Sequence, residues 1–253
     1  MSFIHIDHVS KAYGDQVVLE NLNCHVDKGE FITIVGASGC GKTTFLNMLL
    51  GTENPSRGCI LLEGEPLADE PNEDRGIVFQ RYSVFPHMTA IQNVMLSREL
   101  EQSRFLGRLM GARKSQVRDE AATMLESVGL GQALDKYPHQ LSGGMQQRLA
   151  LAQSLIKKPR ILLLDEPFGA LDPGIRADMH QLVLDLRKEQ QLTIFMITHD
   201  ISEGFYLGTR LWVFDKERID PHAPEAYGAK ITYDIPVGEV EEEILADIHT
   251  NMK

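Results

Sequence analysis

The chain has 253 residues, of which 43% are hydrophobic and 24% are charged, close to the averages of ordinary globular domains. This composition excludes a disordered or fibrous protein, and the length allows one large α/β domain or a core with a subordinate lobe. The net charge of -11 disfavours a protein that binds nucleic acid through a general basic surface.

No apolar run in the sequence approaches the roughly 20 residues that cross a bilayer. The first residues also lack the basic end and the apolar run of a secretory signal. We therefore expect a cytoplasmic chain that serves a membrane, if at all, from outside the lipid. The three cysteines, Cys24, Cys40 and Cys59, are widely spaced and include no C-x-x-C pair, so we expect reduced structural thiols.

The N-terminal part of the chain predicts strands. Two runs, at 3–9 and 17–26, alternate polar and apolar positions, which indicates antiparallel strands. The run FITIV at 31–35 is apolar throughout, which is typical of a central strand buried on both faces. A glycine-rich loop and an apolar helix over 43–50 follow it directly.

Further along, short apolar runs at 59–62 and 75–79 predict two more strands, which we expect to extend the core sheet. The pattern then changes to helical periodicity, with helices predicted at 95–109 and 117–128. These helices predict a helical subdomain, over about 88–155, inserted into the sheet domain.

After this lobe the signals alternate between helix and strand. Ser142 is a good N-cap for a helix that runs through Leu155, and strands are predicted at 161–165 and 192–198. The helix between those strands has an apolar face, formed by Ile175, Met179, Leu182 and Leu186. Alternating strands and helices predict an α/β fold whose mixed, mainly parallel core sheet is wrapped on both sides. We expect one domain over 1–253, with an N-terminal antiparallel β subdomain and a C-terminal extension over 216–253.

The sequence GASGCGKTT matches the pattern G-x-x-x-x-G-K-[ST] between a buried strand and a helix. Its glycines allow the backbone N–H groups to point at phosphate oxygens, helped by the positive end of the helix dipole. Lys42 adds positive charge for the β and γ phosphates, and the Thr43 hydroxyl can bind Mg²⁺. We predict that the whole loop binds ATP: Gly36, Ala37, Ser38, Gly39, Cys40, Gly41, Lys42, Thr43 and Thr44.

Two acidic residues, Asp165 and Glu166, end the apolar run ILLL at the carboxyl edge of the predicted sheet, where α/β proteins bind ligands. Asp165 can hold Mg²⁺, directly or through water. Glu166 can accept a proton from the water that attacks the γ phosphate. The alternative interpretation is that the two acids only begin a loop.

The sequence LSGGMQQR at 141–148 offers a second anion site, because Ser142, Gly143 and Gly144 present a hydroxyl and N–H groups at a helix tip. It resembles the signature sequence of ATP-binding-cassette proteins. The resemblance implies the fold of phosphate-loop NTPases and a dimer, either a homodimer or a pair with a similar ATPase subunit. In that dimer the signature of one subunit closes over the phosphate loop of the other. Met145 departs from the commonest form, which often has Gln, so we expect a tuned site.

The resemblance covers about residues 3–215, and four further positions match in the expected order. Tyr13 resembles the aromatic residue that stacks on adenine, and Gln80 the glutamine that senses Mg²⁺ and the attacking water. Asp172, in GALD, resembles the aspartate that reaches toward the other subunit, and His199 the histidine that contacts the γ phosphate. Taken singly, they could be a sheet-edge tyrosine, an exposed amide, a helix N-cap and a structural histidine.

The resemblance therefore implies specific site roles. Catalysis is assigned to Glu166, His199, Gln80 and Lys42. Mg²⁺ binding is assigned to Thr43, Gln80 and Asp165.

Residues 80–96 resemble the surface that receives a coupling helix from a membrane subunit, with Phe85, Pro86 and Met88 as candidates for its apolar groove. The alternative is that these three side chains pack only internally. The overall pattern resembles the importer branch for nitrate, sulfonate, taurine and related small solutes. It implies integral membrane permease subunits, an indirect partnership with a periplasmic solute-binding protein, and a peripheral location on the inner face of the cell membrane.

Other classes remain open at this point. An ATPase subunit of an exporter of lipid or lipoprotein is the main alternative. A soluble cassette ATPase of DNA maintenance would carry a long coiled coil or zinc modules between Lys42 and Ser142, and no such insertion fits. A non-hydrolysing module would be expected to lose Glu166 or His199. The extension resembles the importer branch only partly, so the solute stays open, and its acidic run at 239–243 predicts a solvated helix start.

Overall fold

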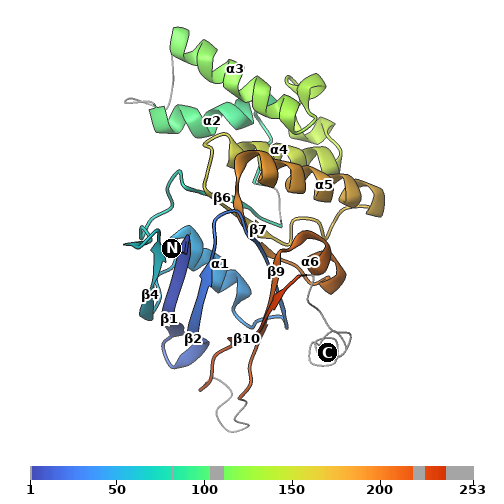
Figure 1. Cartoon of the computed structure of the whole chain (residues 1–253). Coiled ribbons are helices and arrows are strands. Elements are labelled where there is room, and N and C mark those ends of the chain that lie inside the picture. The colour runs from blue at the N-terminus through green and yellow to red at the C-terminus, as the bar shows by residue number, and fades with distance from the viewer. Residues whose placement is uncertain (1, 81–82, 103–110, 219–225, 238–253) are drawn as a thin grey trace. The chain divides into compact units, whose positions relative to one another are not determined.

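The computed structural model describes residues 2–80, 83–102, 111–218 and 226–237 (Figure 1). It consists of two compact units. The first unit comprises Met1–Asn72, Leu163–Glu166 and Gln191–Lys253, and the second comprises Glu73–Leu162 and Pro167–Gln190. Within the described ranges, no helix combines the length and the apolar character that crossing a bilayer requires.

One sheet of the first unit has the strand order β2-β1-β4-β5. Its strands are β1 (Ile4–Tyr13), β2 (Gln16–Val26), β4 (Arg57–Leu62) and β5 (Glu65–Pro66). β1 pairs antiparallel with both β2 and β4, which confirms the predicted N-terminal pair. The prediction that the strand at 59–62 extends the core sheet is wrong. Only Ile60 of β4 is fully buried, and a strand with one wet face suits an antiparallel sheet better than a doubly covered core.

The core sheet of the first unit has the order β10-β9-β3-β8, followed by the end of β7 (Ile161–Asp165). Its other strands are β3 (Phe31–Gly36), β8 (Thr193–Ile197), β9 (Arg210–Asp215) and β10 (Lys230–Pro236). β3 runs parallel to β8 and β9, whereas β10 is antiparallel to β9, so the sheet is mixed, as expected. Every residue of β3 and β8 is buried, as predicted from their continuous apolar runs.

Helices cover both faces of this sheet. α1 (Lys42–Leu50) packs the ring of Phe45 against Phe195, Trp212 and Phe214. On the opposite face, α6 (Ile201–Leu207) lies close to the sheet because Gly204 has no Cβ; one built there would come within 2.9 Å of Leu211. Leu211 and Trp212 are neighbours on β9 and therefore point to opposite faces of the sheet. Trp212 packs against α1, and Leu211 packs against α6.

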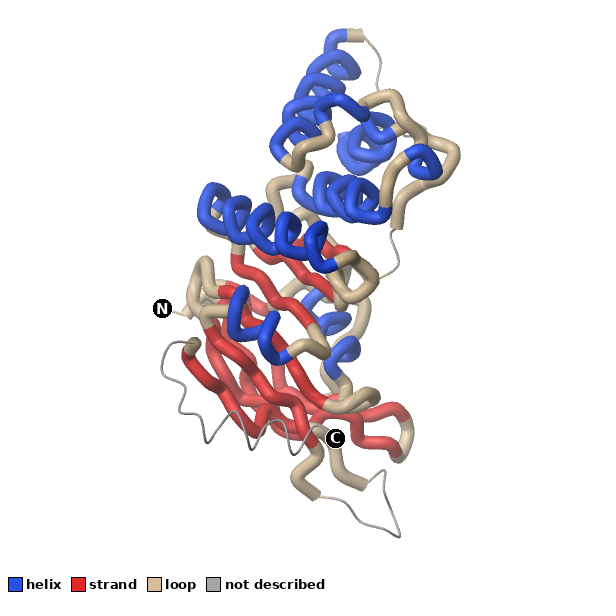
Figure 2. The backbone as a smooth tube through the Cα atoms, turned by 90° about the vertical axis from the view of Figure 1, so that its right-hand side faces the viewer, coloured by secondary structure: helices blue, strands red, loops and turns tan. Residues whose placement is uncertain are grey.

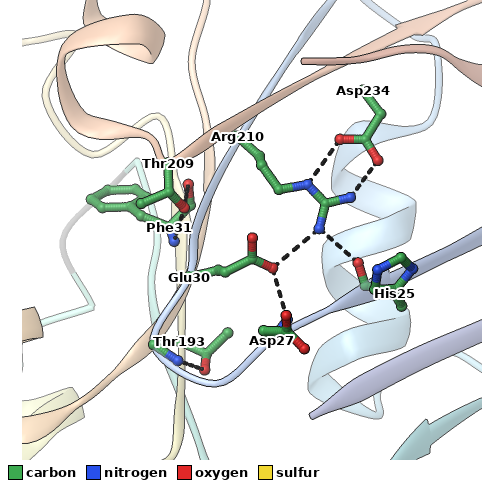
Figure 3. A network of polar contacts seen from close by, with 9 residues as sticks. His25, Asp27, Glu30, Phe31, Thr193, Thr209, Arg210 and Asp234 are labelled. Carbon is green, nitrogen blue, oxygen red and sulfur yellow. Dashed lines mark hydrogen bonds and ion pairs between the residues drawn. The ribbon is translucent and has the colours of Figure 1, made fainter. Parts of the chain in front are cut away.

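Arg210 ties the C-terminal strand to the rest of the unit (Figure 3). Its Nε atom donates to Asp234 on β10 at 2.9 Å, and Nη2 contacts the other oxygen of the same carboxylate. Nη1 donates to the carbonyl of His25 at 2.8 Å and to Glu30 at 3.1 Å. A bidentate arginine pair of this kind fixes geometry as well as adding energy. Of the predicted extension, residues 230–236 thus form an edge strand, while 219–225 and 238–253, with the acidic run, lie outside the described residues.

The second unit contains β6 (Arg75–Val78) and the start of β7 beside it. Its described residues also form four α-helices and two short 3-10 helices, Gly131–Ala133 and Pro138–Gln140. Figure 2 draws the helices of the chain in blue. The α-helices of this unit are α2 (Ala90–Gln102), α3 (Ala112–Ser127), α4 (Gly143–Leu155) and α5 (Pro173–Gln190). α2 and α3 both begin about a turn earlier than the sequence predicts. The first turn of α3 carries few apolar side chains, whereas the start of α2 includes the buried Ala90, Ile91 and Val94, which the prediction missed. The predicted helix end at 109 lies outside the described residues. On α5 the fully buried apolar side chains are Met179, Val183 and Leu186, so Val183 takes the place expected for Leu182, which is only half-buried.

Candidate active site

The phosphate loop joins β3 to α1 in the first unit. Gly36, Gly39 and Gly41 all have positive φ, at 149°, 79° and 87°. A Cβ on Gly36 would lie 2.2 Å from the carbonyl oxygen of Phe214, so only glycine fits there. The loop leads into the first turn of α1, whose N–H groups have no acceptors within the helix and are available to an anion.

Lys42 is folded under this loop and is 6% exposed. Its Nζ atom donates to the carbonyl oxygens of Gly36 at 2.7 Å and Ala37 at 2.8 Å. The thiol of Cys40 lies 3.7 Å from the same Nζ, and burial raises the pKa of that thiol. Ala37, Ser38, Gly39 and Thr43 are exposed, and Thr44 is half-buried. The ammonium group therefore lies inside the loop that the sequence predicts to hold phosphates.

Asp165 and Glu166 lie where β7 ends. Burial, and then the charge of Glu166, raise the pKa of the Asp165 carboxyl, while Lys42 and His199 act in the opposite direction. Glu166 adopts φ of 48°, and its N–H donates to the carbonyl of Ile197 at 3.1 Å. A non-glycine residue in the left-handed region costs on the order of 1 kcal/mol and is common at functional sites. The strained turn points to a constrained role for Glu166.

This arrangement also fits Mg²⁺. No described group of three or more His, Cys, Asp or Glu side chains forms a protein-only metal cage. Mg²⁺ is instead held by one or two carboxylates together with hydroxyl, water and phosphate oxygens. Burial, and then the charge of Glu166, disfavour the ionised form of Asp165, as the raised pKa of that carboxyl shows, and a divalent cation would favour it.

His199 follows β8 and is brought directly to Glu166. Its Nε2 atom contacts Oε1 of Glu166, with the imidazole 54% and the carboxylate 23% exposed. The turn that carries His199 is held by the Thr198 hydroxyl, which donates to Oε2 of Glu203 at 2.5 Å. Four predicted site residues, Lys42, Asp165, Glu166 and His199, therefore meet at the carboxyl edge of the core sheet.

Tyr13 ends β1, and its ring is 46% exposed. The Lys11 ammonium lies 4.9 Å from the ring centroid and 2.6 Å from Oε2 of Glu53. Burial and a hydrogen bond with Glu53 raise the pKa of Tyr13. A hydrogen bond with Thr44 acts to lower this pKa, so the phenol lies beside the first turn of α1. An exposed aromatic ring at this position suits stacking on a nucleotide base.

The remaining predicted site residues belong to the second unit. Ser142 is the N-cap of α4, as predicted, and its Oγ atom accepts from the N–H of Met145 at 3.3 Å. Ser142 and Gly143 are exposed, whereas Gly144 is buried against α5, and a Cβ there would lie 2.4 Å from Cγ2 of Ile175. Asp172 precedes α5 and is exposed, and its carbonyl accepts from the N–H of Arg176 at 2.8 Å.

Gln80 and the segment that follows it are also in the second unit. Gln80 is exposed after β6, and residues 81–82 lie outside the described residues. Phe85 is 42% exposed, with its ring 6.1 Å from that of His87. Pro86 is exposed and Met88 is half-buried, so these side chains are not simply internal.

Asn93 holds this segment in place, a role that the sequence analysis missed. The Asn93 side chain is fully buried, accepts from the N–H of Phe85 at 2.7 Å and donates to its carbonyl at 3.1 Å. It also donates to the carbonyls of Met88 and Thr89, both at 3.0 Å. An asparagine near a helix start carries little signal by itself. By contrast, Asp200 and Glu203, which hydrogen-bond with Thr198 and with each other beside His199, have the D-x-x-E spacing of a capping box, which is a recognisable sequence signal.

The phosphate loop at a helix tip, with two carboxylates and a histidine at the same sheet edge, defines the class of phosphate-loop nucleoside triphosphatases. A family model described as ABC transporter matches residues 19–169. The chain therefore belongs to the ABC transporter family, and it is an ATPase of the cassette type.

Individual relatives agree with this membership. The chain is 40% identical over 226 residues to the nitrate import ATP-binding protein NrtD of Synechocystis sp., covering 89% of this chain and 79% of that protein. It is 39% identical over 226 residues to the bicarbonate transport ATP-binding protein CmpD of the same organism, covering 88% and 76%. The ATP-binding cassette MJ0796 was solved as a dimer in a post-hydrolysis state with ADP and Pi. It aligns with this chain with a TM-score of 0.74 and 28% identity, and the alignment covers 94% of this chain and 100% of that chain.

Proposed function

We propose that this chain is the ATP-hydrolysing subunit of an importer, and that it energises uptake of a small solute through separate membrane subunits. The observation that carries the proposal is the convergence of Lys42, Asp165, Glu166 and His199 at one edge of the core sheet. These groups offer positive charge for phosphates, a ligand for a cation, a base and a positioning group. The entire chain forms one cassette, with the helical subdomain over about 88–155 and the extension over 216–253 as its parts.

The chemistry follows from these residues. The loop N–H groups and Lys42 bind the phosphates of ATP, and the exposed ring of Tyr13 stacks on the adenine. Thr43 and Asp165 of the first unit are the residues that would hold Mg²⁺, which when bound neutralises phosphate charge. Glu166 accepts a proton from the attacking water, and His199 orients that water and the γ phosphate. The contact of the imidazole with the carboxylate places both groups at one point of the sheet edge.

Two subunits complete each site in this proposal. Ser142, Gly143 and Gly144 lie at the tip of α4, and in one subunit they close over the phosphates held by the other. Asp172 lies just before α5, and Ile175 in the first turn of α5 contacts Gly144. Asp172 is therefore close to the signature segment, and in this proposal it reaches toward the same interface. The dimeric state of the related cassette MJ0796 supports a homodimer or a pair with a similar subunit.

The exposed Phe85 and Pro86, within 80–96, are proposed to receive a coupling helix of an integral membrane permease. The hydrogen bonds of Asn93 with the backbone of Phe85 support a docking role, because they hold this segment in one conformation. Relatives named for nitrate import and bicarbonate transport support a small solute of the nitrate, sulfonate or taurine kind. In such a system the chain lies on the inner face of the cell membrane, and a periplasmic solute-binding protein delivers the solute to the permease.

Uptake measurements test this function. Cells that lack the gene are assayed with labelled nitrate, bicarbonate and taurine, and are complemented with the wild-type chain or with Lys42→Ala. We expect the uptake of one solute to fall and to return only with the wild-type chain. Normal uptake of every small solute, together with impaired lipid or lipoprotein export, would replace the importer by an exporter.

A further inference from the structure

The turn that carries His199 is very short. β8 ends at Ile197 and α6 begins at Ile201, so only three residues, 198–200, connect them. Thr198 is 4% exposed and its N–H donates to the carbonyl of Ile34 on β3 at 3.1 Å, which fixes one end of the turn to the core sheet. The orientation of the exposed His199 therefore depends on how the other end is held.

A buried carboxylate holds that other end. Glu203, one turn into α6, is 8% exposed, and its Oε2 accepts from the Thr198 hydroxyl at 2.5 Å. The same hydroxyl accepts from the N–H of Asp200 at 3.1 Å, and the Asp200 carboxylate accepts from the N–H of Glu203 at 3.2 Å. These three hydrogen bonds join Thr198, Asp200 and Glu203, which flank His199 in the sequence, and His199 makes none of them itself.

We propose that Thr198 and Glu203 are positioning residues for ATP hydrolysis, which act by holding the imidazole of His199 against Glu166. The inference rests on the proposed roles of His199 and Glu166 in hydrolysis. A carboxylate that accepts from a hydroxyl forms a strong, short hydrogen bond, and in a buried place it has little competition from water. The pairing limits the backbone freedom of the three-residue turn, and so fixes the imidazole before substrate arrives.

A merely structural role would have a different consequence. If the Thr198–Glu203 bond served only to dock α6, its loss would lower stability without acting through His199. The chain offers a matched control for docking, because the buried Thr33 hydroxyl donates to the carbonyl of Gly204 on the same helix at 3.0 Å. Thr33→Val removes a buried hydroxyl bond to α6 but leaves the 198–200 turn intact.

The experiment compares steady-state ATPase kinetics of the full chain with Mg²⁺ present. For Thr198→Val we expect kcat to fall about tenfold with KM for ATP within about twofold of wild type, because a positioning defect acts on the chemical step. Thr198→Ser retains the hydroxyl and restores kcat to within about twofold. Thr33→Val, matched by its thermal unfolding temperature, retains kcat.

A double-mutant cycle with His199→Ala completes the test. If Thr198 acts through His199, the double variant Thr198→Val, His199→Ala is no slower than His199→Ala alone, within about twofold. Additive losses, or a Thr198→Val variant with wild-type kcat, overturn the inference. If Thr198→Val does not fold, Glu203→Gln is measured in its place. We expect its kcat to fall about threefold, and a wild-type kcat would again overturn the inference. A wild-type rate in His199→Ala alone would instead contradict the proposed role of His199 in hydrolysis.

Discussion

The imidazole of His199 contacts the carboxylate of Glu166, although the two residues follow different strands of the core sheet. The backbone brings them together, because the N–H of Glu166 donates to the carbonyl of Ile197, the last residue of β8. A group that can accept a proton and a group that can orient water are thus placed at one point.

Replacing Glu166 by Gln should retain ATP binding and slow hydrolysis at least about a hundredfold, because the amide cannot accept the proton from water. The variant should also accumulate a closed, ATP-bound dimer. Single-turnover hydrolysis and size-exclusion chromatography with ATP measure both effects. Glu65→Gln, an exposed change on β5, is the control with unchanged rate. Near-normal turnover by Glu166→Gln would remove this residue from the role of base.

Replacing Lys42 by Ala should weaken ATP binding at least about tenfold, since it removes a charged donor from the phosphates. Titration with a fluorescent ATP analogue measures the dissociation constant. Lys28→Ala removes an equal charge from an exposed turn and should leave the constant unchanged. Equal affinity in the Lys42→Ala and wild-type chains would mean that the loop holds a different ligand.

Replacing Gly144 by Ala should lower the free energy of unfolding by about 1–3 kcal/mol, since its Cβ would overlap Cγ2 of Ile175 at 2.4 Å. ATP-dependent dimerisation should weaken as well. The second change Ile175→Ala removes the overlapping atom and should restore dimerisation, measured by light scattering. Gly174→Ala is the control, because a Cβ at Gly174 meets nothing within 4 Å. Failure of the double variant to recover would show that Gly144 serves another purpose.

Replacing Asn93 by Ala should cost about 2–3 kcal/mol of unfolding free energy, because it removes a fully buried side chain and leaves several part-buried backbone groups of the 85–89 segment without this partner. Urea denaturation measures this cost. Gln92→Ala, which removes one exposed hydrogen bond to the N–H of Thr89, should cost much less. If the segment receives a permease, Asn93→Ala should also lose more solute uptake than ATP hydrolysis by the free chain.

The three thiols should react in a fixed order. Burial raises the pKa of Cys24 to about 12 and also raises that of Cys40, whereas Cys59 is exposed. Since the thiolate is the reactive form and its fraction rises as pH approaches the pKa, Cys24 and Cys40 stay protonated at pH 8. Alkylation with iodoacetamide followed by mass spectrometry should label Cys59 first, and Cys24 and Cys40 more slowly. Labelling of Cys24 as fast as that of Cys59 would contradict the raised pKa of the Cys24 thiol.

Local sequence patterns were sufficient for the phosphate loop and the strands around it. The loop is a contiguous backbone motif, and its glycines at 36, 39 and 41 adopt the positive φ that the pattern requires. β3 and β8 were predictable because a strand covered on both faces must be apolar at every position. The N-cap role of Ser142 was equally local, since its hydroxyl bonds within the first turn of α4.

Tertiary structure alone decided which of these pieces meet. Nothing local in β4 indicates that it pairs with β1 and not with the core, because a short strand's partner is chosen by long-range register. The contact of His199 with Glu166 depends on two strands lying side by side, and the hold of Asn93 on the 85–89 segment depends on its burial in the folded unit. Such contacts join side chains that are far apart in the sequence and of common types. The sequence therefore does not reveal them, and only the folded backbone brings these side chains together.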